Sequence, residues 1–92
     1  MLGGASHGAC LMEEVRSIVA RFPQRELEIR RCFARDAQFR AVCADHEEAT
    51  RAHRHWLHAA KGGDPEASRK AADYERLIDE LEQEALTYLG KA

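Results

Sequence analysis

A short segment with two adjacent glycines, Lys61-Gly62-Gly63-Asp64-Pro65, separates two long amphipathic patterns in this sequence. Glycine has no Cβ, so it suits the left-handed conformation that ends many helices. Asp64 can cap the following helix by accepting a hydrogen bond from a backbone N–H, and Pro65 fits a first helical turn, where no N–H is needed. The segment therefore predicts an antiparallel helical hairpin.

The composition favours an all-α protein. One third of the 92 residues are charged, with both signs interleaved as on the solvated faces of long helices. Ala, Glu, Arg and Leu are abundant and β-branched residues are few, which also favours helices. A formal net charge of -2 argues against a general binder of nucleic acids or membrane surfaces, and no apolar run approaches the ~18 residues of a membrane span.

Hydrophobic periodicity predicts three helices. Val15, Ile18 and Phe22 recur at helical spacing, and Pro23 is expected to end this first helix because proline disfavours helical geometry in the residue before it. The predicted helices cover about residues 12–22, 24–60 and 65–89.

The same patterns predict the domain organisation. Residues 1–11 are expected to form a flexible N-terminal extension, and residues 12–92 a single helical domain. The three cysteines, Cys10, Cys32 and Cys43, form no Cys-x-x-Cys pair, so we expect no disulfide framework and a cytoplasmic location.

Heptad-like spacing along both arms of the hairpin predicts a coiled-coil-like seam. Two helices leave one apolar side exposed after packing, so either the first helix or a second copy of the chain should cover it. We favour the second copy, and hence a homo-oligomeric bundle. The expected core and interface residues are Phe39, Val42, Cys43, His46, Trp56, Leu57, Tyr74, Leu77, Ile78, Leu81 and Tyr88. With the turn centred near Gly63, His46 should lie near Ile78.

Four histidines, His46, His53, His55 and His58, gather in one stretch of the long helix. His55 and His58 are three residues apart and share a face, a spacing that can chelate zinc, copper or nickel. However, no Glu is followed by a His three residues later, as a di-iron bundle requires. We therefore expect no cofactor, with His46 and His53 setting the register of the seam, and a metal-binding bundle as the alternative.

A second alternative is a small regulator that contacts RNA through Arg51, Arg54 and Trp56. The arginines would bind phosphates and a base would stack on the indole. Glu47 and Glu48 dilute this basic stretch, and the chain as a whole is not basic. Trp56 distinguishes the hypotheses, since it should be exposed in an RNA-binding protein and packed in the core of an interaction module.

The sequence does not favour an enzyme. Cys43 and His46 could pair as nucleophile and base, but no motif supplies an oxyanion hole or a pocket. The carboxylates of the last helix are expected to lie on a solvated face: Asp79, Glu80, Glu82 and Glu84.

One series of residues is collinear with a known pattern. It consists of Phe22-Pro23, Glu26, Ile29, Asp36, Phe39 and Asp45-His46, followed by Tyr74, Leu77, Asp79-Glu80-Leu81 and Leu89. In these residues the chain resembles the YdcH-like proteins, small bacterial helical hairpins with no assigned biochemical function. Cys32, Val42, Ala49 and His53 depart from the Leu or Ile usual in that family. The resemblance implies a coiled-coil-like hairpin in a bacterial cytoplasm and no catalytic residues.

Taken together, the patterns predict a small non-enzymatic helical interaction module. It would associate with itself or bind a protein partner through a helical face.

Overall fold

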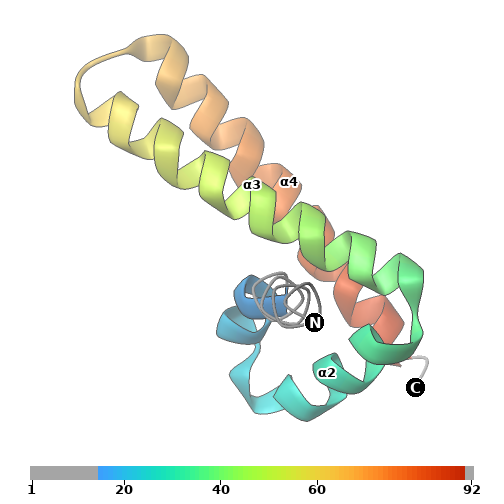
Figure 1. Ribbon diagram of the computed structural model, residues 1–92. Coiled ribbons are helices and arrows are strands. Elements are labelled where there is room, and N and C mark those ends of the chain that lie inside the picture. Colours follow the sequence, from blue (N-terminus) through green and yellow to red (C-terminus); the bar gives the residue numbers. More distant parts are fainter. Residues whose placement is uncertain (1–14, 91–92) are drawn as a thin grey trace, which may run out of the picture.

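Residues 15–90, which a computed structural model describes, form helices joined by short connections (Figure 1). The all-α class and the helical hairpin predicted from the sequence are confirmed. Residues 15–21 are helical and are followed by η1 (Pro23–Arg25), α2 (Glu26–Arg35), α3 (Ala37–Lys61) and α4 (Pro65–Gly90). None of these helices is both long enough and apolar enough to cross a membrane. The predicted extension over residues 1–11 lies outside the described residues, as do residues 12–14 of the predicted first helix.

The glycine segment forms the hairpin turn between α3 and α4. Gly63 has a φ of 95°, in the left-handed region, whereas Gly62 has a φ of -81° and needs no glycine for that reason. Asp64 caps α4, because its Oδ1 accepts from the backbone N–H of Glu66 at 3.0 Å. Helix α4 then begins at Pro65 as predicted.

The two arms pair symmetrically about the turn. The Tyr88 hydroxyl donates to Oε1 of Gln38 at 3.2 Å, and these residues lie equally far along the chain on either side of Gly63. His46 hydrogen-bonds to Glu82, one helical turn beyond the predicted neighbour Ile78, and both α4 residues line one groove with His46. The turn is therefore centred where the sequence places it.

The prediction of one continuous helix over residues 24–60 is wrong. After η1, the chain forms α2 and α3, which are separated by Asp36 in an extended conformation (φ -123°, ψ 109°). Asp36 Oδ1 accepts from the backbone N–H groups of Gln38 and Phe39, at 2.9 and 3.2 Å, and so caps α3. Arg40 donates from Nη1 to the carbonyl of Phe33 at 2.7 Å, which provides a partner for the free end of α2.

This break directs α2 back over the base of the hairpin, where most of the core lies (Figure 1). Residues 15–21 and α2 contribute Val15, Ile18, Ile29, Cys32 and Phe33 to the core. Helices α3 and α4 contribute Phe39, Val42, Cys43, Ala49, Leu81, Ala85 and Leu89. The tip of the hairpin extends away from α2 and consists of α3 and α4 alone.

The predicted core therefore divides into three groups. Phe39, Val42, Cys43, His46 and Leu81 are buried. Trp56, Tyr74, Ile78 and Tyr88 are only partly buried. Leu57 and Leu77 are exposed, contrary to their expected place in the core, because two helices alone cannot cover every apolar side chain along their contact.

Candidate functional site

A polar network centred on the buried side chains of His46 and Glu82 joins three parts of the fold at the base of the hairpin. His46 of α3 is 2% exposed; its Nδ1 lies 2.7 Å from Ser17 Oγ and its Nε2 lies 3.0 Å from Glu82 Oε2. A carboxylate can only accept, so a neutral His46 ring carries its hydrogen on Nε2 and accepts from the Ser17 hydroxyl at Nδ1. Arg21 donates from Nε to the second oxygen of Glu82 at 3.1 Å. We call these four residues the His46 network.

The His46 network corrects the sequence analysis at one residue. Glu82 was expected on a solvated face but is 7% exposed, because it lies between Ile78 and Ala85 on the buried stripe of α4. This periodicity was the available signal for its burial. Nothing in the sequence singled out Ser17 or Arg21. Through Ser17 and Arg21, residues 15–21 cover one side of the hairpin. The sequence left two candidates for this cover, the first helix or a second copy of the chain, and the first helix covers this side.

The order hydroxyl, imidazole, carboxylate also occurs in serine hydrolases, where it activates a nucleophile. Here the carboxylate is tied to the Arg21 guanidinium and the imidazole is enclosed between two arms of the fold. Each bond of the network holds one helical segment to another, so we interpret it as structural. The hypothetical Cys43–His46 pair does not form, since both ring nitrogens of His46 bond to other side chains.

The other histidines of α3 lie outside the His46 network. His53 is partly buried and lines a groove beside Ser17 and Thr50. His55 is exposed and packs edge-on against Trp56, with ring centroids 4.9 Å apart. His58 is exposed. Within residues 15–90, no three His, Cys, Asp or Glu side chains come together as potential metal ligands.

Trp56 is neither fully in the core nor fully exposed. It is partly buried, and Nζ of Lys70 on α4 lies 5.1 Å from the centroid of its ring. This cation–π contact links α3 to α4 near the tip of the hairpin. Of the proposed RNA-contacting residues, Arg51 forms an ion pair within α3: its Nη2 lies 3.6 Å from Oε2 of Glu47, one helical turn away.

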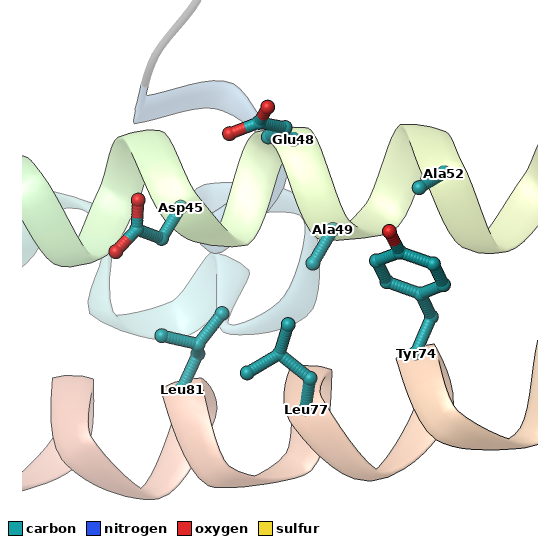
Figure 2. Close-up of a pocket in the computed structure, with 7 residues that line it drawn as sticks. All are labelled: Asp45, Glu48, Ala49, Ala52, Tyr74, Leu77 and Leu81. Carbon is teal, nitrogen blue, oxygen red and sulfur yellow. The ribbon is translucent and has the colours of Figure 1, made fainter. Parts of the chain in front are cut away.

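A groove with an apolar floor runs between α3 and α4, as Figure 2 shows. Leu77, Leu81 and Tyr74 rise from α4 towards α3, where Ala49 and Ala52 present only methyl groups. Leu77 remains 39% exposed because the alanines opposite are too small to cover it. We call this surface, lined by Asp45, Glu48, Ala49, Ala52, Tyr74, Leu77 and Leu81, the α3–α4 groove.

Carboxylates line the α3–α4 groove on α3, and others lie near Leu77 on α4. Asp45 and Glu48 line it on α3. On α4, Asp73 and Glu80 lie four residues before and three residues after Leu77, so they share its face. All four are exposed, and none belongs to an ion pair within residues 15–90. The groove therefore combines an apolar floor with negative edges.

No protein-family model, curated protein or solved structure matches this chain. The resemblance to the YdcH-like proteins stays a prediction.

Proposed function

We propose that the protein is a non-enzymatic helical interaction module of the bacterial cytoplasm. It binds a second copy of itself or another protein through the α3–α4 groove. The observation that carries this proposal is Leu77, a large apolar side chain left half-covered between two helices and bordered by Tyr74 and Leu81. A third helix laid along such a pair buries the exposed leucine and completes a bundle.

The rigidity of the hairpin supports this proposal. The His46 network and the core hold the base of α3 and α4, and the Trp56–Lys70 contact joins the same helices near the tip. The groove lies between these two points, so its shape is largely set before any partner arrives. A preorganised surface loses less conformational entropy on binding than a mobile one.

Native mass spectrometry on untagged protein from its own cells tests the proposal. We expect a complex whose mass exceeds one chain by a second copy or by another protein, and we expect Leu77→Asp to release it by placing a charge in the apolar floor. A single-chain mass across the cellular concentration range would contradict the proposal.

Two alternatives stay predictions. A metal-binding bundle using His46, His53, His55 or His58 predicts a stoichiometric metal in the same spectra. An RNA-contacting regulator predicts bound nucleic acid whose affinity falls steeply with salt. Detection of a bound metal or of bound nucleic acid would favour the corresponding alternative over the interaction module.

A further inference from the structure

We propose that the α3–α4 groove is the docking site for a basic amphipathic helix of a partner protein, in which an apolar stripe is flanked by Lys and Arg. This inference rests on the proposed function and specifies the chemistry of the partner. Its two grounds are the apolar floor and the nearby carboxylates, which form no ion pair within the described part of the chain.

The floor selects the shape of the partner. On α3, Ala52 is small and partly exposed, one turn from the buried Ala49, which allows another helix to approach closely. Leu77 and Tyr74 offer larger apolar surfaces on α4. A helix seated here would insert residues spaced at i, i+3 or i+4, and i+7, the spacing with which amphipathic helices occupy apolar grooves.

The edges select the charge of the partner. Asp45 and Glu48 line the groove on α3, and helical spacing places Asp73 and Glu80 on the Leu77 face of α4. All four are exposed. None of them forms an ion pair within residues 15–90, so their oxygens are open to a ligand. Lys or Arg on both sides of an apolar stripe would complement both edges.

The same charges disfavour a second copy as the occupant. In a two-fold dimer the same surface of each chain faces its equivalent, so the acidic edges of one groove would meet those of the other. Like charges brought together across an interface oppose association. We therefore assign the groove to a different, basic chain.

Titration of the ¹⁵N-labelled full chain by NMR tests the inference. The probe is an 18-residue helical peptide with Leu and Ala on one face and Lys on the other. A matched peptide carries Glu in place of each Lys. We expect the Lys peptide to shift the amide signals of Ala49, Ala52 and Leu77, and the Glu peptide to leave them unchanged. Raising the salt concentration should weaken the binding, because exposed charges are screened within about 10 Å at 0.1 M.

Matched variants separate docking in the groove from general attraction to an acidic protein. Asp73→Asn with Glu80→Gln should weaken binding about threefold to tenfold at low salt. Glu75→Gln with Asp79→Asn removes the same charges from another face of α4 and should have no comparable effect. Leu77→Ala should weaken binding about fivefold or more, whereas Leu27→Ala, at a leucine 62% exposed on α2, should not.

Three results would overturn the inference. The two charge variants could weaken binding equally, the signal changes could be confined to another face, or the Glu peptide could bind as well as the Lys peptide. Dimerisation through the groove in the absence of peptide would also overturn it. The Lys peptide could fail to bind while native mass spectra still show a bound protein that Leu77→Asp releases. In that case the partner is not basic and the proposed function stands. If both fail, the proposed function fails as well.

Discussion

His46 and Glu82 are the polar pair on which the base of this small fold depends. The imidazole of His46 and the carboxylate of Glu82 are buried. Each of their polar atoms forms a hydrogen bond to another side chain, which compensates for the loss of hydration. Such a pair is sensitive to the loss of one partner, because the other is then left buried without its hydrogen bond.

Glu82→Ala should therefore lower the free energy of unfolding by about 2–3 kcal/mol, through the stranded Nε2–H of His46 and the lost contact with Arg21. Chemical denaturation of the full chain measures the change. Glu80→Ala is the control, since Glu80 is exposed two residues away and its loss should matter by no more than about 0.5 kcal/mol. Equal effects of the two substitutions would show that the network contributes nothing.

Cys32 gives the fold a dependence on alkaline pH. Burial, together with the nearby carboxylate of Asp36, raises the pKa of its thiol above the ordinary value of 9.0. The neutral thiol is therefore favoured in the folded state, and its contribution is complete below about pH 9 and is lost as the pH rises further. Unfolding free energies measured from pH 8 to 10 should fall more steeply for the native chain than for Cys32→Ala. Parallel curves would rule this contribution out.

At the scale of the element, local chemistry decided which boundaries could be predicted. The turn at Gly63 and the start of α4 at Pro65 could be predicted because glycine and proline each suit backbone conformations that occur at helix ends. The break at Asp36 could not, because the apolar spacing from Ile29 to Phe39 continues across it, and a long helix could carry Asp36 as one polar residue of its seam. The break is held by contacts outside the local pattern, such as that of Arg40 with the Phe33 carbonyl.

Asp36→Ala should cost about 1 kcal/mol of stability by removing the cap of α3. Asp36→Ser keeps a side-chain acceptor in the same position and should retain most of that stability. Thermal unfolding of the two variants, followed by circular dichroism, makes the comparison. If Asp36→Ala is as stable as Asp36→Ser, the cap does not hold the break between α2 and α3.

The candidate site was predictable only in part. Tyr74, Leu77 and Leu81 follow from the apolar stripe of the last helix, and they form the α4 side of the groove. The burial of Glu82 and the exposure of Leu77 were missed for one reason. Residue type suggests a preferred environment, but the position of a third helix decides which side chains on a two-helix surface are covered.

At the scale of the whole molecule, the two halves of the hairpin differ. The base is covered on one side by residues 15–21 and by α2, whereas α3 and α4 form the tip alone (Figure 1). An elongated shape of 44 × 35 × 21 Å leaves much of this hairpin at the surface. The uncovered α3–α4 groove is a place where another helix would extend the core.

Site-specific photo-crosslinking in the native cells tests this account most directly. A benzophenone amino acid replaces Leu77 in the groove or, as a control, Asp79 on another face of the same helix. The account predicts a discrete crosslinked protein from position 77 and none from position 79. No adduct at position 77, or the same adducts from both positions, would contradict the claim that the α3–α4 groove is the binding surface.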